Sequence, residues 1–222
     1  MSRWLVVVAL IALPLSTIGR AQFGRGAPPA RPVAGHGIDV PGWWARMDNP
    51  QASGRLMLMS ESAAVLHART GPAAIFWDPR ETASGEYTVK ATFTVRRMPT
   101  FEEGYGLFIG GENLDKDNER YTAFLAREDG EYAIRERRGV PPGGAAAANW
   151  MTSAALMRPD ASDHVTNELA IHVGRDTVTF MANGKQVATR PVSAVDAKGI
   201  AGLRVNNNLD LRIEGFTIEK DK

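Results

Sequence analysis

The sequence contains no cysteine among its 222 residues. Disulfide bonds and a lipid-modified N-terminal cysteine are therefore excluded. A folded domain of this chain must be held together by its hydrophobic core, without covalent cross-links.

Histidine is also scarce, and its spacing does not suit a metal site. The four histidines, His36, His67, His164 and His172, form no His-x-His or His-x-x-x-His pair, so a transition-metal centre would need distant ligands to converge. The chain also lacks a Gly-x-Ser-x-Gly motif and a glycine-rich phosphate-binding loop. Serine nucleophile chemistry and nucleotide use therefore have no support.

A strong excess of either charge is absent too. The chain has 26 basic and 25 acidic residues, and removal of residues 1–21, which contain Arg3 and Arg20 but no acid, leaves 24 and 25. This balance argues against nucleic acid as a partner, because such binding needs a basic face that neutralises phosphates. It gives no attraction to anionic membranes either.

A long apolar run occurs only at the N-terminus. Met1-Ser2-Arg3 is followed by an apolar run from Trp4 to Leu13, and Gly19-Arg20-Ala21 supplies small residues for cleavage, so residues 1–21 are predicted to be a secretory signal peptide. The alternative, a buried N-terminal helix, lacks the expected amphipathic periodicity. We expect an exported protein, periplasmic or extracellular, without membrane insertion after cleavage.

The remaining chain divides into a leader and one domain. Residues 22–42 are rich in proline and glycine and poor in large apolar side chains, which predicts a tether that cannot fold alone. Residues 43–222 contain short apolar stretches separated by Gly, Pro, Asn and Asp, as in a β-sandwich. A length of about 200 residues suits a single domain of this kind.

Two hairpin signatures stand out in the second half of the chain. Asp129-Gly130 lies at the centre of residues 121–137, and Asn183-Gly184 lies at the centre of residues 176–189. These dipeptides tolerate the positive φ angles of a type I′ turn. The chain is therefore predicted to be all-β and antiparallel.

Residues 87–95 show the clearest strand pattern. Apolar residues alternate there with polar ones; the apolar set is Tyr87, Val89, Ala91, Phe93 and Val95. Because side chains repeat every two residues along a strand, the apolar row faces the core, and the polar row, with Lys90 and Thr92, is exposed. Leu169, Ile171 and Val173 repeat the pattern beside His172. We therefore expect one polar sheet face that meets solvent or a ligand, and through which the chain could also form an oligomer of unknown size.

Four segments carry a resemblance to a known superfamily: Gly104–Gly111, Tyr121–Arg137, Val178–Lys185 and Gly199–Val205. Over residues 43–220 the chain resembles the concanavalin A-like lectin/glucanase superfamily, and is most similar to its laminin-G-like and 3-keto-disaccharide-hydrolase-like (DUF1080-type) domains. The resemblance implies an antiparallel two-sheet jelly-roll sandwich. The Glu-x-Asp-x-x-Glu motif of the laminarinase-like members is absent, which argues against retaining glycoside hydrolysis by that route.

One acidic loop has alternating oxygen ligands, as calcium loops do. Its candidate metal ligands are Asp115, Asp117 and Glu119, but Lys116 adds a repelling charge and Arg120 stands where an EF-hand has its turn glycine. Two interpretations stay open, a structural calcium site and a solvated loop.

Aromatic and arginine side chains provide the only candidate ligand site. Sugars bind to aromatic platforms surrounded by planar polar groups, and the predicted contacts are Tyr105, Arg135, Arg137 and Trp150. Arg135 and Arg137 share one face of a strand because they are two residues apart. In the alternative, the arginines pair with glutamates of their own hairpin and Trp150 packs into the core.

Two functions remain open on these grounds. The first is an exported, non-catalytic domain that recognises a glycan or another envelope polymer. The second, implied by the resemblance alone, is a carbohydrate-active hydrolase of the 3-keto-disaccharide-hydrolase-like type. Convergent carboxylates with perturbed ionisation would favour the enzyme, and an aromatic-lined groove without them would favour the binding domain.

Overall fold

The computed structural model describes residues 37–49, 55–139 and 149–221. Their elements form two stacked sheets, and every strand pairing is antiparallel except that of β1 with β3. The eight-stranded sheet has, in spatial order, β1 (Ile38–Asp39), β3 (Leu56–Ser62), β4 (Val65–Thr70), β15 (Asp210–Lys220), β6 (Tyr87–Val95), β11 (Val165–Val173), β12 (Thr177–Ala182) and β13 (Lys185–Pro191).

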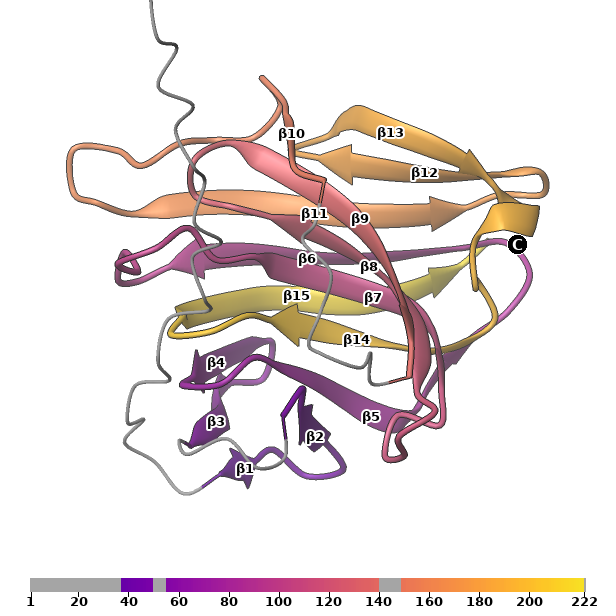
Figure 1. The fold of residues 1–222 in the computed structure, drawn as a ribbon, viewed down its shortest axis with the longest axis horizontal. Helices are drawn as coiled ribbons and strands as arrows, with labels where there is room; N and C mark the ends of the chain where they lie inside the picture. The colour runs from indigo at the N-terminus through magenta and orange to yellow at the C-terminus, as the bar shows by residue number, and fades with distance from the viewer. Residues whose placement is uncertain (1–36, 50–54, 140–148, 222) are drawn as a thin grey trace, which may run out of the picture.

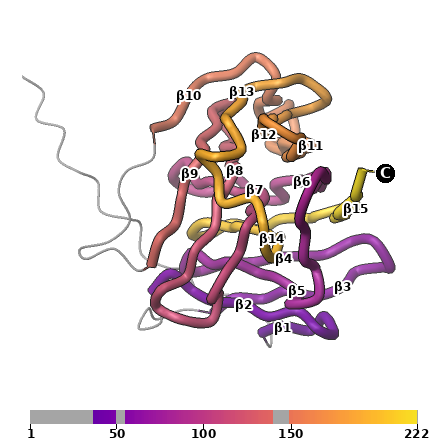
Figure 2. Tube along the Cα trace, turned by 90° about the vertical axis from the view of Figure 1, so that its right-hand side faces the viewer, coloured from indigo at the N-terminus to yellow at the C-terminus, as the bar shows by residue number. Residues whose placement is uncertain are grey.

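The second sheet has seven strands. In spatial order these are β10 (Met151–Thr152), β9 (Glu131–Arg138), β8 (Arg120–Ala126), β7 (Tyr105–Glu112), β14 (Gly199–Val205), β5 (Ala74–Ala83) and β2 (Trp44–Met47). A short 3₁₀ helix, Val192–Ala194, follows β13. The two sheets overlap in Figure 1, and the turned view in Figure 2 separates β8 and β9 from β6 and β15. The predicted all-β, two-sheet sandwich is confirmed.

The main core lies between the sheets. Phe93 on β6 and Tyr105 on β7 place their ring centroids 5.6 Å apart, and Phe124 on β8 lies 5.4 Å from Phe180 on β12. All four side chains are buried. These cross-sheet contacts identify the inner face of each sheet, and therefore also the outer one, because side chains alternate along a strand.

Strand β6 has the faces that its sequence predicts. Tyr87, Val89, Phe93 and Val95 are buried, whereas the polar residues between them are half-exposed. The period-two pattern is confirmed because β6 lies in the middle of the eight-stranded sheet, between β15 and β11, with its outer face open to solvent.

The two predicted hairpins form, but their turns differ. At Asn183-Gly184 both residues have positive φ, 50° and 74°, and Ala182 pairs directly with Lys185, as in the predicted type I′ turn. In the β8–β9 hairpin the amide of Gly130 donates to the Arg127 carbonyl and the amide of Arg127 donates to the Glu131 carbonyl. Gly130 has a φ of 84°, so this is a three-residue loop with one left-handed glycine, and the prediction of a type I′ turn there is wrong.

The N-terminal part of the sandwich starts earlier than the sequence predicts. Strand β1 lies within the segment assigned to the leader, yet Ile38 pairs with Leu58 of β3. The predicted signal peptide, residues 1–21, lies outside the described residues. In the part of the chain that the structure describes, no helix has the length and apolar character needed to span a membrane.

Candidate functional site on the outer face of the seven-stranded sheet

The seven-stranded sheet carries a second apolar cluster on its outer face. Its buried members are Ile75, Trp77, Phe108, Leu114, Tyr121, Ala123 and Leu125. On β7 and β8 these residues alternate with the inner-face residues of the main core. Both faces of these strands are therefore apolar and buried, in contrast to β6.

Strand register places one row of this cluster across the sheet. Trp44 on edge strand β2 pairs with Trp77, Trp77 pairs with Gly202, and Gly202 pairs with Phe108. A Cβ at Gly202 would lie 2.6 Å from the Phe108 ring, so glycine allows this ring to lie across the strand. The row continues through Ala123 on β8.

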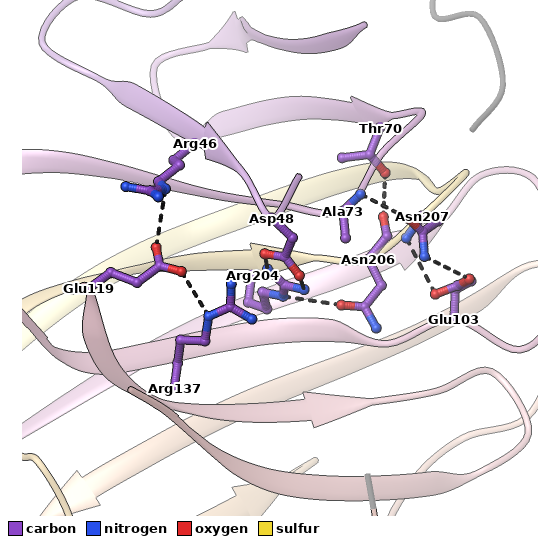
Figure 3. Close-up of polar contacts among 10 residues, drawn as sticks. All are labelled: Arg46, Asp48, Thr70, Ala73, Glu103, Glu119, Arg137, Arg204, Asn206 and Asn207. Carbon is purple, nitrogen blue, oxygen red and sulfur yellow. Dashed lines mark hydrogen bonds and ion pairs between the residues drawn. The ribbon is translucent and has the colours of Figure 1, made fainter. Parts of the chain in front are cut away.

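The centre of the face is occupied by a buried ion pair. Arg204 on β14 donates two hydrogen bonds to Asp48, at 2.5 and 2.6 Å, and a third to Asn206 at 3.1 Å (Figure 3). Burial alone would raise the pKa of Asp48, but the charge and hydrogen bonds of Arg204 hold it below its usual range. Both side chains are therefore charged at neutral pH.

A second ion-pair group lies beside the first. The Nε of Arg137 on β9 donates to Glu119 at 2.8 Å, and the Nε of Arg46 on β2 lies 3.5 Å from the other oxygen of the same carboxylate. Figure 3 shows Glu119 between the two guanidinium groups. Arg46 also contacts the exposed Asp117 at 2.8 Å.

A small, open depression of about 30 Å³ lies next to these ion pairs. Its lining consists of Asp48, Tyr121, Ala123, Leu125, Arg135, Glu136, Arg137 and Arg204. Ala123 lies directly opposite Arg135 in the β8–β9 ladder, and its small side chain leaves space beside the guanidinium group. Burial, together with the positive charge of Arg204, lowers the pKa of Arg135.

Tryptophans lie at two margins of this face. Trp44 is 53% exposed, and its ring centroid is 6.2 Å from that of Trp77. Trp150 packs against the outer cluster and has the guanidinium of Arg127 4.6 Å from its ring centroid, a cation–π contact. A Cβ at Gly104 would lie 2.8 Å from the Trp150 ring, so the indole fits because residue 104 is glycine.

Two buried carboxyl groups lie near the Trp150 end of the sheet. Burial raises the pKa of Glu128 to about 7, and its Oε2 has no hydrogen-bond partner in the described part of the chain. Burial also raises the pKa of Glu103, which accepts hydrogen bonds from the amide and side chain of Asn207 (Figure 3). Neither glutamate lines the depression.

Three of the four predicted ligand contacts share this outer face. Arg135 and Arg137 line the depression, and Trp150 packs against the same apolar cluster. The arginines lie in the sheet opposite to β6 and β11, the strands whose polar face suggested a ligand surface. The alternative paired the arginines with Glu131 or Glu136 of their own hairpin. Arg137 instead pairs with Glu119, while Glu131 contacts Arg127 and Glu136 contacts Arg138 and Arg190, so this alternative is wrong for Arg137.

The prediction that Tyr105 contacts a ligand is wrong. Its side chain is fully buried in the inter-sheet core, where its hydroxyl accepts a hydrogen bond of 3.0 Å from the buried Asn167. A ring in this position is not accessible to a ligand on the outer face. Tyr105 is therefore a core residue.

The predicted calcium ligands do not come together. Asp115 is exposed, Asp117 contacts Arg46, and Glu119 is buried between Arg46 and Arg137. Among the described residues, no three His, Cys, Asp or Glu side chains form a group that could hold a metal ion. The carboxylate of Glu119 instead forms ion pairs with Arg46 and Arg137.

Several residues of the site were missed in the sequence, namely Trp44, Arg46, Asp48 and Arg204. One signal was available for Arg204, which is the single charged residue in the apolar strand Gly199–Val205. A charged residue in a strand that is otherwise buried needs a partner. Nothing in the sequence indicates that this partner is Asp48, 156 residues away.

Comparison with known proteins assigns the fold. No protein-family model and no curated protein matches the chain. A protein of unknown function with a galectin-like fold from Bacillus subtilis matches with a TM-score of 0.57 and 15% identity, covering 80% of this chain and 89% of that one. The protein named Cellulose induced protein, Cip1, matches with a TM-score of 0.50 and 11% identity, covering 81% and 91%. The chain thus has a galectin-like β-sandwich fold.

Proposed function

We propose that the protein is a glycan-recognition domain that binds its ligand on the outer face of the seven-stranded sheet. One observation carries the proposal: a depression on this face combines an apolar floor with the guanidinium groups of Arg135, Arg137 and Arg204. Sugars offer C–H faces that stack on apolar and aromatic surfaces, and hydroxyls that accept hydrogen bonds from oriented donors. The resemblance to lectins and glucanases supports the same ligand class.

The exposed Trp44 extends this surface beyond the depression. It lies in the same outer-face row as Trp77 and Phe108, at the open edge of the sheet. A half-exposed indole that rests on a second indole is held in place and still presents one face to a ligand. We infer that the site takes an oligosaccharide, with one sugar over the depression and another towards Trp44.

A glycan-array screen followed by calorimetry on the hits tests this function. Trp44→Ala should weaken binding about tenfold because stacking on the ring is lost. His172→Ala, on the outer face of the eight-stranded sheet, is the matched control and should leave affinity unchanged. Loss of affinity with His172→Ala but not with Trp44→Ala would move the site to the opposite sheet.

The second candidate function, a carbohydrate-active hydrolase, has one observation in its favour. Glu128 is a buried carboxyl group with a pKa of about 7, as general acids and bases have. Glu128 does not line the depression. Asp48 does, but its negative charge is balanced by the ion pair with Arg204. The same glycan hits, incubated with the protein and assayed for new reducing ends, separate the two functions.

We also propose that the protein is exported, on the basis of the predicted signal peptide at residues 1–21. We propose that its domain belongs with the laminin-G-like or 3-keto-disaccharide-hydrolase-like domains, on the basis of the sequence resemblance.

A further inference from the structure

Trp150 is held in place by two separate segments of the sandwich. The guanidinium group of Arg127, in the β8–β9 loop, lies 4.6 Å from the centroid of its ring. The ring also lies against the backbone at Gly104, just before β7, where a Cβ would be 2.8 Å from it. The position of this indole at the margin of the outer face therefore depends on the β8–β9 loop and on the segment before β7.

Glu128 joins these two segments. It follows Arg127 in the β8–β9 loop, and the backbone amide of Glu103, the residue before Gly104, donates a hydrogen bond to its carboxylate. Glu128 is only 5% exposed. A movement that brings its carboxylate into water must therefore displace the loop, the segment before β7 or both, and with them the contacts of Trp150.

The β8–β9 loop is also attached to the chain that follows Trp150. The amide of Ser153 donates to the carbonyl of Gly130 at 3.0 Å, and Met151 pairs with Tyr132 near the start of β9. Opening of the loop therefore loosens the backbone that carries the indole as well as the cation–π contact.

The β8–β9 loop gives Glu128 little compensation for a negative charge. Its Oε2 has no hydrogen-bond partner in the described part of the chain. Burial is the largest influence on the pKa of Glu128 and raises it to about 7; Asp129 acts in the same direction, whereas Arg127 and the backbone amides act against it. The guanidinium group of Arg127 is also engaged elsewhere, since it donates to Asp129 at 2.6 Å and lies over Trp150.

Charged and titratable groups also approach from the neighbouring segments. Tyr105 on β7 interacts electrostatically with Glu128, but burial raises the pKa of Tyr105, so that its phenol is uncharged at neutral pH. Burial likewise raises the pKa of Glu103. A cation, Arg158, reaches the loop at Gly130 from the segment before β11. Even with this cation in place, the loss of hydration keeps the pKa of Glu128 raised.

We propose that Glu128 is a pH-dependent switch for the position of Trp150: its neutral carboxyl group keeps the β8–β9 loop closed against the indole, and its carboxylate opens the loop. A buried charge without a hydrogen-bond donor is costly, and movement into water relieves that cost. The closed form therefore prevails below about pH 7 and the open form above it. The effect on Trp150 needs no ligand, whereas the effect on glycan affinity rests on the proposed function.

The first measurement is made on the protein alone. Acrylamide quenching of tryptophan fluorescence, with the signal of Trp150→Phe subtracted from that of the wild type, reports how accessible Trp150 is between about pH 5.5 and about pH 8.5. We expect this quenching to increase as pH rises, with a midpoint near pH 7. Glu128→Gln, which keeps the shape of the side chain and cannot ionise, should remain weakly quenched throughout.

Two further variants assign the midpoint to Glu128. Histidine normally titrates at about pH 6.5, so His164→Gln, at an exposed position just before β11, is the matched control and should leave the midpoint unchanged. Asp129→Asn should move the midpoint to lower pH, because Asp129 raises the pKa of Glu128. This shift identifies Glu128 even if Glu128→Gln does not fold, which thermal unfolding of each variant checks.

Calorimetry with a hit from the glycan array then measures the effect on binding. The wild type should bind about tenfold more weakly at about pH 8.5 than at about pH 5.5, because stacking on the seated indole is lost. Glu128→Gln should bind with the same affinity at both pH values.

The outcomes separate the switch from the proposed function. If the quenching of Trp150 does not change with pH, or if its change persists in Glu128→Gln, the switch is overturned and glycan recognition stands. If the quenching changes as expected but no glycan binds at either pH, the switch stands and glycan recognition fails. If a glycan binds with an affinity that ignores the release of Trp150, the regulatory role of the switch is overturned.

Discussion

The outer faces of the two sheets are built in opposite ways. On β6 the outward residues, such as Lys90 and Thr92, are polar and half-exposed. On β7 and β8 the outward residues, such as Phe108 and Tyr121, are apolar or aromatic and buried. Residues 87–95 alternate between apolar and polar because the outer face of β6 is polar and open to solvent. Strands β7 and β8 are nearly continuous apolar runs because both of their faces are buried.

The ion pairs on the two faces differ in the same way. Lys90 and Glu219, on the eight-stranded sheet, have side chains 41% and 56% exposed. Arg204 and Asp48, on the seven-stranded sheet, are only 7% and 23% exposed. An exposed pair contributes little to stability, because solvent screens it. A buried pair is sensitive to the loss of either partner, because the remaining charge has lost its hydration.

The largest expected change in stability comes from removing one cation from each face. Arg204→Met should lower the free energy of unfolding by about 3–5 kcal/mol, because Asp48 is left buried without its bidentate partner. Lys90→Met should cost less than about 1 kcal/mol. Urea denaturation of both variants measures the difference, and similar costs would show that the two faces do not differ in their electrostatics.

A pH titration tests the burial of Glu128, the carboxyl group near Trp150. Glu128 has a pKa raised by burial to about 7, against an ordinary value of 4.5 in the unfolded chain. The folded state therefore holds its proton more tightly, so the contribution of Glu128 to stability is present below pH 4.5 and is lost as pH rises towards 7. The loss is on the order of 2–3 kcal/mol.

Glu128→Gln keeps the shape of the side chain and removes the titration. Asp129 and Arg127 act on the pKa of Glu128 in opposite directions, and both stay in place in this variant. Its unfolding free energy should fall less than that of the wild type between pH 4.5 and 7, with the other titrating groups cancelling in the difference. Parallel curves for the two proteins over that interval would contradict a buried Glu128.

The hairpin turns give the smallest expected effects, one in each sheet. Gly130→Val and Gly184→Val should each destabilise the protein by about 1–3 kcal/mol, because a β-branched residue is strained at positive φ. At Gly184 an added Cβ meets nothing within 4 Å, so strain is the whole cost there, whereas at Gly130 it would also approach Arg158 at 3.1 Å. Urea midpoints measure both variants, and unchanged midpoints would mean that these residues do not set the turns.

The sequence alone determined the features that depend on local chemistry. The alternation of residues 87–95 and the Asn183-Gly184 turn were predicted correctly, because side-chain direction along a strand and positive φ in a tight turn are set by neighbouring residues. The site was predicted only in part. Arg135 and Arg137 were placed together because they are two residues apart on one strand.

The tertiary structure decided which face each residue occupies. Tyr105 and Phe108 belong to the same apolar strand, yet Tyr105 lies in the inter-sheet core and Phe108 on the outer face. A strand that is apolar on both sides contains no signal that tells its two faces apart. The pairing of Arg204 with Asp48 likewise depends on strands β14 and β2 meeting β5 from opposite sides. Contacts between distant segments are fixed by the packing of the whole sheet, so the buried charges of the site become visible only when the chain is folded.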